Sequence, residues 1–453
     1  MELRPYQKED VKKLLQHDTG CCFNEQRTGK TPTALTVFNE RGLKKYLVVC
    51  PKTAIMQWAE EINTWTTLTA IPVTGTKSKK QKTISAWTEG VLIINYDSLK
   101  QTSTSEGLTK LIIQQHPEGL ILDEAHRIKN HSTQTSKAIF YFLNHVRYRL
   151  ALTGTPIDKS EHLFSLVKYI LPQQFPSYWS FVSEYCDISV GYATGGRTFK
   201  QITGFKKEKL PEIQQILDTY CTQRKRKDIL PWLPEKDYQK VFLKPNAEQT
   251  KAIQELETFF ETGNIITQGI LDRLIRIRQI CTAPEILGIP SKSSPKFDWI
   301  LDFIKDYPEK PILIFTNFTS AIKLLEQKLS NFKFGVICGE TTINKRNEYK
   351  HAFQNGKINI LLINIQAGKE ALTLDRAEAS IFLDKYPPVS SILQAEDRFV
   401  ATTENKKDKP HTIYELILQD TYDEQLYQLL EQRASEADVI NNYKKYIERR
   451  NTV

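Results

Sequence analysis

The sequence lacks paired cysteines, long apolar runs and a leader-like start, and each of these shortages excludes a class of protein. Its seven cysteines are scattered, odd in number and never arranged as Cys-x-x-Cys, so they indicate neither a zinc ribbon nor a disulfide framework. We expect them to be small buried apolar residues. No apolar run reaches the roughly 18 residues of a membrane span, and residues 1–6 lack the basic start of a signal peptide. The sequence therefore predicts a soluble cytoplasmic or nuclear protein without a membrane partner.

What is present fits a multidomain protein with a modest basic excess. A chain of 453 residues is too long for one ordinary core and predicts two or three domain-sized units. Sixty-two basic residues against fifty-three acidic ones leave a net charge of +9, which is compatible with a phosphate-backbone partner but does not establish one. Basic residues cluster at 77–82 and 224–227, and such runs fit a solvated face as well as a nucleic-acid contact.

Short apolar runs alternate with longer amphipathic stretches in both halves of the chain. Runs of four to seven residues rich in Val, Ile, Leu and Tyr, lying between helical patterns, are typical of a buried parallel sheet with helices on both faces. The expected strands are 46–50, 91–95, 120–123 and 149–153 in the first half, and 312–317, 334–339, 358–364, 379–384 and 414–418 in the second. Two α/β domains are therefore predicted.

The middle of the chain, 171–245, breaks this alternation with six prolines and a glycine-bearing stretch at 191–196. We interpret that stretch as a turn between two short strands, because no helical pattern follows it as a phosphate loop requires. Helical patterns then cover 249–260 and 270–280, and the charged, amphipathic residues 420–450 predict one or two terminal helices.

Residues 28–31 read Thr-Gly-Lys-Thr and precede a helical pattern. Phosphate binding requires backbone N–H groups that approach closely, a lysine that neutralises phosphate charge and a hydroxyl that helps to hold Mg²⁺. Gly29, Lys30 and Thr31 supply these groups. The glycine that usually stands five residues before Gly29 is absent, because Asn24 occupies that position. By itself this short match leaves a chance loop as an alternative.

Residues 120–126 place two adjacent carboxylates at the end of an apolar strand, in an Asp-Glu-Ala-His quartet. The carboxyl ends of parallel strands are where ligands bind, so acids are expected there. Asp123 is suited to hold a metal ion, and Glu124 to orient or deprotonate an attacking water. An ordinary strand end before a helix N-terminus accounts for the two acids alone, but not for the quartet downstream of Gly-Lys-Thr.

Residues 152–156, Leu-Thr-Gly-Thr-Pro, follow the next expected strand. Small hydroxyl residues at that edge, Thr153 and Thr155, are suited to sense a γ-phosphate. A turn with a helix cap uses the same residue types, and taken alone this motif favours the turn.

In this order, the motifs resemble those of the superfamily-two helicases and, within them, the Snf-type duplex-DNA translocases. The segments that carry the resemblance are 3–7, 24–31, 46–58, 95–98, 123–126 and 153–156 in the first half, 224–236 in the middle, and 311–318, 361–374 and 394–398 in the second half. The middle segment looks like the basic strip of the Snf-type insertion, which separates this chain from generic RNA helicases.

The resemblance implies an α/β fold of two tandem RecA-like P-loop domains with a helical and β insertion between them. The expected boundaries are 1–170 for the first motor domain, 171–294 for the insertion and helical connector, and 295–453 for the second motor domain with its C-terminal helices. ATP with Mg²⁺ is expected between the two lobes, and alternate gripping of the phosphodiester backbone would turn lobe closure into stepping.

Residue roles follow from motif position. The nucleotide-binding residues implied are Gln7, which reads the adenine, with Thr28, Gly29, Lys30 and Thr31. The magnesium ligands implied are Thr31 and Asp123, and the catalytic residues are Lys30, Asp123, Glu124 and the arginine finger Arg398. Coupling residues are His126, Thr153, Thr155 and Gln394. DNA-backbone contacts are Lys52, Thr53, Asn95, Asn317, Gln366 and Lys369. For Trp58 a buried core position is favoured over stacking on a base.

Two positions depart from the family pattern. The family usually has a second arginine three residues after Arg398, where this chain has Ala401. An arginine from the opposite lobe stabilises the transferred phosphoryl group by ~10³-fold or more in rate, so the finger is either Arg398 alone or another residue. Gly368 is followed by Lys369, Glu370 and Ala371 where the family continues with glycines. ATP hydrolysis is still expected, but the two departures raise the chance that the ATPase is slow or tightly regulated.

The expected function is an ATP-dependent DNA translocase or helicase acting on duplex, forked or four-way DNA. A motor without an appended module resembles compact bacteriophage and bacterial members, so branch migration or fork remodelling in recombination, replication or repair is the leading hypothesis. A monomer in a bacterial or phage-infected cytoplasm is expected. The alternatives are a motor that strips proteins from DNA and an ATP-responsive DNA clamp with little turnover. DNA is not distinguished from RNA by backbone contacts.

Overall fold

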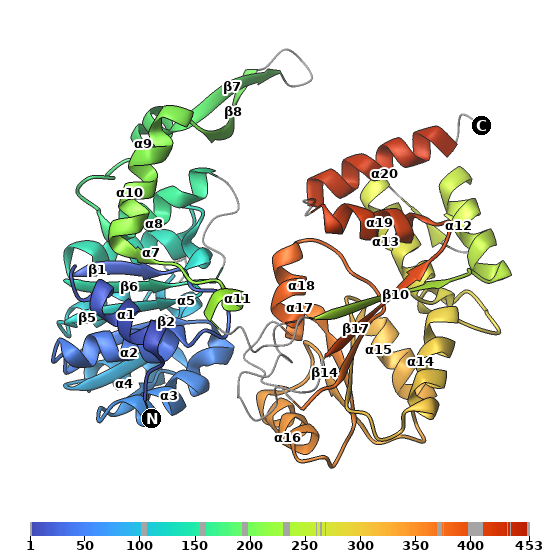
Figure 1. Ribbon diagram of the computed structural model, residues 1–453, viewed down its shortest axis with the longest axis horizontal. Helices are drawn as coiled ribbons and strands as arrows, with labels where there is room; N and C mark the ends of the chain where they lie inside the picture. Colours follow the sequence, from blue (N-terminus) through green and yellow to red (C-terminus); the bar gives the residue numbers. More distant parts are fainter. Residues whose placement is uncertain are drawn as a thin grey trace. The chain divides into compact units, whose positions relative to one another are not determined.

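The chain forms two compact units, Met1–Pro231 and Trp232–Val453, each treated by itself below. The computed structural model describes residues 2–100, 107–154, 160–192, 198–229, 236–259, 261–262, 265–267, 269–368, 374, 376–396, 411–432, 434 and 436–450. Unit 1 runs from blue to green in Figure 1, and unit 2 continues to red.

Unit 1 contains a seven-stranded sheet in which every neighbouring pair is parallel. The strands in spatial order are β3 (Ala70–Pro72), β4 (Gly90–Asn95), β2 (Lys45–Cys50), β5 (Gly119–Asp123), β6 (Tyr148–Leu152), β1 (Thr19–Cys22) and β9 (Cys221–Thr222). Because parallel neighbours share one carboxyl edge, the residues after β1, β2, β4, β5 and β6 gather on one side of the unit.

Helices cover both faces of this sheet, as alternating side chains of buried strands require. Tyr46 and Val48 of β2 pack with α1 (Pro5–Leu14), α2 (Lys30–Glu40) and α3 (Ile55–Trp65). Leu47 and Val49 of the same strand face the opposite core. That core includes residues of α4 (Lys77–Ser85), α5 (Tyr96–Leu99), α6 (Thr109–Ile113), α7 (Gln134–Phe140) and α8 (Leu163–Ile170).

An extension follows α8 in unit 1. It consists of α9 (Tyr178–Tyr185), the antiparallel pair β7 (Cys186–Tyr192) and β8 (Thr198–Phe205), α10 (Leu210–Tyr220) and the short α11 (Arg226–Ile229). The β7–β8 hairpin projects beyond the sheet (Figure 1) and packs through its own small core with α8 and α9. Two short antiparallel strands thus flank the stretch 191–196, as predicted; the turn itself, residues 193–197, lies outside the described residues.

Unit 2 is built on a second parallel sheet, of six strands. The spatial order is β10 (Asp237–Leu243), β17 (Thr412–Leu418), β16 (Ala379–Phe382), β13 (Ile312–Thr316), β15 (Ile360–Asn364) and β14 (Phe334–Ile337). One core contains residues of α14 (Pro295–Asp306) and α15 (Thr319–Lys328). The other contains residues of α12 (Ala247–Phe259), α13 (Ile270–Thr282), α16 (Ile343–Gln354), α17 (Ile365–Gly368), α18 (Val389–Glu396), α19 (Tyr422–Glu431) and α20 (Glu436–Arg450).

All nine strands expected from the sequence are present, with ends displaced by at most two residues. The prediction of two tandem α/β units is confirmed. The packing division at Pro231 assigns 171–231 to unit 1 and 232–294 to unit 2, so the expected middle segment is shared between them. The expected functional-domain boundaries at residues 170 and 294 stay predictions, because the division into compact units does not test them.

All seven cysteines are buried, as expected for small apolar side chains. Within the described residues, no helix combines the length and the apolarity that crossing a bilayer requires.

Candidate nucleotide site and nucleic-acid interface

The loop between β1 and α2 is shaped by Gly29, the N-cap of α2, whose backbone lies in the left-handed region at φ 75°. A Cβ added there would lie 2.1 Å from Gln7 Nε2. Gln7 is buried; its Nε2 donates to the carbonyl oxygens of Gly29 at 3.2 Å and Thr28 at 3.4 Å, and its Oε1 accepts from Arg4 N at 2.8 Å. Gln7 therefore braces the loop from α1, while adenine reading stays a prediction.

Asn24, which replaces the usual leading glycine, has a structural partner that sequence reasoning missed. Its Nδ2 donates to Asp10 Oδ2 at 2.7 Å, and both residues are buried. Asp10 Oδ1 in turn accepts from Arg224 Nε at 3.0 Å. The side-chain amide thus ties the loop to α1 and to the start of the basic segment 224–227, which a glycine cannot do.

Lys30 lies over this loop. Its Nζ donates to the carbonyl oxygens of Asn24 at 3.0 Å and Glu25 at 3.1 Å. A Cβ built on Gly154, just after β6, would lie 3.6 Å from the same Nζ. The ammonium group is therefore beside the ends of both β1 and β6, and Thr31 follows it on the first turn of α2. This is a donor set that suits a triphosphate.

The two acids end β5. Trp58 Nε1 donates to Asp123 Oδ2 at 2.8 Å, and Glu124 N donates to Asp123 Oδ1 at 3.0 Å. Burial and then the charge of Glu124 raise the pKa of Asp123 to about 6, against the lowering effects of the Trp58 hydrogen bond and of Lys30. A pocket that penalises adjacent negative charges favours a cation, so the pair fits the expected Mg²⁺.

Glu124 itself adopts a left-handed backbone, φ 51° and ψ 51°, which is uncommon for a residue with a side chain and is typical of functional sites. His126 Nδ1 lies 3.3 Å from Glu124 Oε2 and 3.2 Å from Thr153 Oγ1. Two of the predicted coupling residues, His126 and Thr153, are therefore in contact with each other, and His126 also contacts the predicted water-handling carboxylate.

The candidate DNA contacts of unit 1 share the carboxyl edge of β2 and β4, where Cys50 pairs with Asn95. Lys52 is exposed and Thr53 half-buried on a short 3₁₀ turn, Lys52–Ala54. Asn95 Oδ1 accepts from Ser98 Oγ at 2.7 Å, and Ser98 Oγ accepts from Lys80 Nζ at 2.6 Å. One lysine of the 77–82 run is thus connected to this edge.

In unit 2, Asn317 and Gln366 lie at the carboxyl edge of the second sheet, because they follow β13 and β15, which are parallel neighbours. Asn317 Nδ2 donates to Asp384 Oδ2 at 2.6 Å, and Asn364 Nδ2 donates to the Asn317 carbonyl at 3.0 Å. Arg278 Nη2 also donates to Asp384, at 3.2 Å. Sequence reasoning missed Asp384, although it ends an expected strand as Asp123 does.

A buried charge cluster anchors the end of α18 in unit 2. Lys385 Nζ lies 3.0 Å from Glu396 Oε1 and 2.5 Å from Glu415 Oε1, and all three are buried. Glu396 Oε2 accepts from Lys236 Nζ at 3.0 Å and Tyr238 Oη at 2.6 Å. Burial opposes ionisation of Glu396, but Lys385 and Lys236 outweigh it and lower its pKa to about 2.

Three predicted site residues, Thr155, Lys369 and Arg398, lie outside the described residues, as does Ala401. Gln394 lies on α18. Their roles remain predictions.

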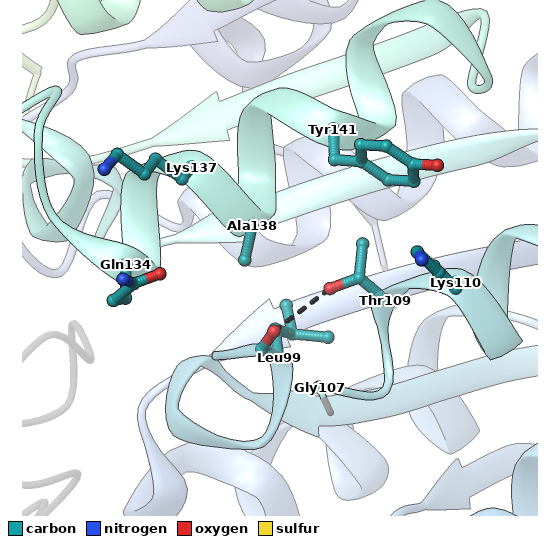
Figure 2. Close-up of a pocket in the computed structure, with 8 residues that line it drawn as sticks. All are labelled: Leu99, Gly107, Thr109, Lys110, Gln134, Lys137, Ala138 and Tyr141. Carbon is teal, nitrogen blue, oxygen red and sulfur yellow. Dashed lines mark hydrogen bonds between the residues drawn. The ribbon is translucent and has the colours of Figure 1, made fainter. Parts of the chain in front are cut away.

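A separate pocket of about 230 Å³ opens between the start of α6 and α7 (Figure 2). Lys110 and Lys137 stand on opposite sides of it, Tyr141 lies beside it, and Thr109 Oγ1 donates to the Leu99 carbonyl at 3.1 Å. The motif residues named above are not among those that line it, so we assign no ligand to it.

Comparison with known proteins identifies two families along the chain. The SNF2-related domain matches residues 6–286, and the helicase conserved C-terminal domain matches residues 295–400. Together the two matches run from residue 6 to residue 400, apart from 287–294.

Among similar curated proteins, the DNA annealing helicase and endonuclease ZRANB3 of Bos taurus is 25% identical over 412 residues, covering 88% of this chain and 37% of that protein. The DNA repair and recombination protein RDH54 of Saccharomyces cerevisiae is 24% identical over 423 residues, covering 85% and 43%. An uncharacterized ATP-dependent helicase of Mycoplasma pneumoniae is 24% identical over 452 residues, covering 94% and 41%. The chain thus spans less than half the length of these relatives.

Among solved structures, the Sulfolobus solfataricus SWI2/SNF2 ATPase core in complex with dsDNA is 24% identical. The match covers 95% of this chain and 91% of that chain, with a TM-score of 0.43.

Proposed function

This chain belongs to the SNF2-related domain family, and from that membership we propose that it is a DNA-stimulated ATP hydrolase that moves along DNA. The Snf-type resemblance predicted from its motifs is confirmed by the two family matches. The observation that carries the proposal is the convergence, within unit 1, of Lys30, the Asp123–Glu124 pair and the His126–Thr153 contact at one sheet edge.

The proposed nucleotide chemistry assigns each role to a residue of this edge. Lys30 neutralises the phosphates, and Thr31 and Asp123 hold Mg²⁺, which supplies charge neutralisation and polarisation of the phosphoryl group. Glu124 orients the attacking water and accepts its proton. His126 and Thr153, together with Thr155 and Gln394, transmit the presence or absence of the γ-phosphate to the rest of the motor. Arg398 is proposed as the finger, in the absence of a second arginine at Ala401.

The proposed DNA contacts are made to the phosphodiester backbone. Lys52, Thr53 and Asn95 in unit 1, with Asn317, Gln366 and Lys369 in unit 2, are the candidates. Contacts of this kind carry little base specificity. They weaken as the salt concentration rises, because releasing condensed counterions into a more concentrated salt solution gains less free energy. We therefore propose a motor that is indifferent to sequence and sensitive to ionic strength.

Within this class we propose remodelling of forked or four-way DNA, with branch migration as the leading activity. Support comes from the names of relatives, an annealing helicase and a repair and recombination protein. Ala401 motivates the alternative of an ATP-responsive DNA clamp, since it removes one expected arginine from the nucleotide-facing motif.

The first test is steady-state ATP hydrolysis by the full chain without nucleic acid and with single-stranded DNA, duplex DNA, a four-way junction or duplex RNA. We expect duplex or junction DNA to raise kcat by about tenfold or more, equivalent to lowering the activation free energy by about 1.4 kcal/mol or more. A junction preferred over plain duplex supports branch migration. The absence of turnover on every substrate, with ATP-dependent DNA binding retained, would favour the clamp.

We expect Gly29→Ala to weaken ATP binding by about tenfold, equivalent to about 1.4 kcal/mol. The substitution forces a left-handed backbone onto a residue with a Cβ and drives that Cβ into Gln7 Nε2. The measurement is titration with a fluorescent ATP analogue in the presence of Mg²⁺.

The matched control is Gly42→Ala, which carries the same kind of strain at φ 70° but whose Cβ meets no described atom within 4 Å. Equal ATP affinities in the two variants would show that the contact with Gln7 has no part in shaping the loop.

A further inference from the structure

Both segments of unit 1 that are proposed to grip DNA also reach the metal-binding carboxylate residue. From the first segment, Trp58 Nε1 donates to Asp123 Oδ2 at 2.8 Å. From the second, Tyr96 Oη donates to the Asp123 carbonyl at 2.7 Å. Asp123 is thus held at one carboxylate oxygen and at its backbone carbonyl oxygen by residues from the two segments that contain Lys52 and Asn95.

Trp58 is joined rigidly to the Lys52–Ala54 turn. The helix α3 begins at Ile55, directly after that turn. Trp58 is only 2% exposed and packs in the same core as Ile55 and Ile62. A displacement of the turn on binding a phosphate therefore moves the indole with the helix, because a close-packed core transmits displacements rather than absorbing them.

Tyr96 makes an equivalent connection from the second segment. It is the first residue of α5, next to Asn95, and is buried. The hydrogen bonds from Lys80 to Ser98 and from Ser98 to Asn95 end at the residue directly before Tyr96. A phosphate that binds Lys80 or Asn95 would therefore shift Tyr96, whose hydroxyl donates to the Asp123 carbonyl at the end of β5.

The orientation of the Asp123 carboxylate depends on these contacts. Oδ1 accepts from Glu124 N at 3.0 Å and Oδ2 accepts from Trp58, so each oxygen has one fixed donor. An indole N–H is a donor only and offers no alternative pairing. Groups that hold a metal ligand in this way set its direction and commonly change metal affinity or activity by about 10- to 100-fold when lost.

We propose that Trp58 is a positioning residue that couples DNA binding to the nucleotide site by orienting Asp123, with Tyr96 as a second connection. This inference rests on the proposed function, since it presupposes that DNA and ATP bind to the same chain. Coupling is reciprocal: DNA should tighten binding of Mg²⁺ with an ATP analogue, and the analogue should tighten DNA.

The experiment compares wild type, Trp58→Phe, Tyr96→Phe and the control Trp87→Phe in the full chain. Trp87 is equally buried in unit 1 but donates its indole N–H to the Gly90 carbonyl at 3.1 Å, so its variant loses the same kind of bond away from Asp123. The affinity for a non-hydrolysable ATP analogue with Mg²⁺ is measured with and without saturating duplex DNA, alongside thermal melting and stimulated turnover.

For wild type and Trp87→Phe we expect DNA to tighten analogue binding by about 5- to 150-fold, the usual range of coupling factors. Trp58→Phe should lower that factor to near unity, and Tyr96→Phe, which loses only a hydroxyl, to an intermediate value. Should Trp58→Phe fail to fold, Tyr96→Phe still decides the matter against Trp87→Phe.

If both Trp58→Phe and Tyr96→Phe keep the factor of the control, the inference is overturned while the DNA-stimulated ATPase stands. If wild type itself shows neither a coupling factor nor stimulated turnover, the proposed function fails and the inference with it.

Discussion

We expect Glu124→Gln to reduce the steady-state kcat for ATP hydrolysis by about 10²- to 10⁴-fold, the usual contribution of a positioned general base. Glutamine keeps the size and one acceptor of the side chain but cannot take a proton from water at neutral pH. The contact with His126 Nδ1, 3.3 Å away in the wild type, retains an acceptor. Affinity for ATP should stay within a few-fold of the wild type, because Lys30 and the loop are untouched. Single-turnover hydrolysis and analogue titration in parallel separate the two quantities.

The matched control is Glu118→Gln, an exposed glutamate before the amino end of the same strand, which accepts from Lys44 N and Lys45 N. It removes an equal charge at the edge opposite to the proposed site, so kcat should remain near the wild-type value. If Glu124→Gln and Glu118→Gln hydrolyse ATP equally fast, Glu124 does not handle the water. Hydrolysis would then depend on another group of the edge.

We expect Lys385→Met to lower the free energy of unfolding of unit 2 by about 3–5 kcal/mol, the usual cost of removing one partner from a buried ion pair. Glu396 and Glu415 lose their shared buried cation, whereas Lys236 and Tyr238, among the described residues, still contact Glu396. Urea denaturation of the full chain measures the effect, with hydrogen exchange of the unit 2 strands assigning the transition, because a chain of two units need not unfold in one step.

Two further variants make this result specific. Lys240→Met breaks the partly exposed ion pair with Glu431 and should cost at most about 1 kcal/mol. Adding Glu415→Gln to Lys385→Met removes one stranded charge and should restore part of the loss. A Lys385→Met protein as stable as Lys240→Met would contradict the cluster as an anchor of α18.

The same cluster predicts a pH dependence. The pKa of Glu396 is about 2 in the folded chain, below its ordinary 4.5, so its ionised form is favoured by folding. The resulting stabilisation is fully present above pH about 4.5 and is lost as the pH falls toward 2. This acid-labile component should shrink in Lys385→Met.

Four strands show which parts of the fold the sequence predicted and which it did not. β2 and β13 carry short runs rich in Val, Ile, Leu or Phe, which are typical of buried strands, and both were predicted nearly to the residue. β1, with the sequence Thr-Gly-Cys-Cys, lacks such a run and was missed although it is buried. β10 is an edge strand whose first four residues are exposed, so its pattern carries no continuous apolar run.

The candidate site divides in the same way. Lys30, Asp123, Glu124 and Thr153 were identified because their chemistry requires those residue types next to strand ends, where parallel sheets bring them together. The contact of Trp58 with Asp123 was not predicted. The sequence favoured a buried core position for Trp58, which its 2% exposure confirms, but burial does not name a hydrogen-bond partner sixty-five residues away.

By itself, the sequence determined that this protein has two α/β units and the ordered motifs of the Snf-type family, because apolar periodicity and short-range spacing are local properties of the chain. Only the tertiary structure decided which polar groups meet: Asn24 with Asp10, Trp58 and Tyr96 with Asp123, and Lys385 with Glu396 and Glu415. A buried polar group must be paired, but any of many distant residues satisfies that requirement, and the choice depends on strand order and register.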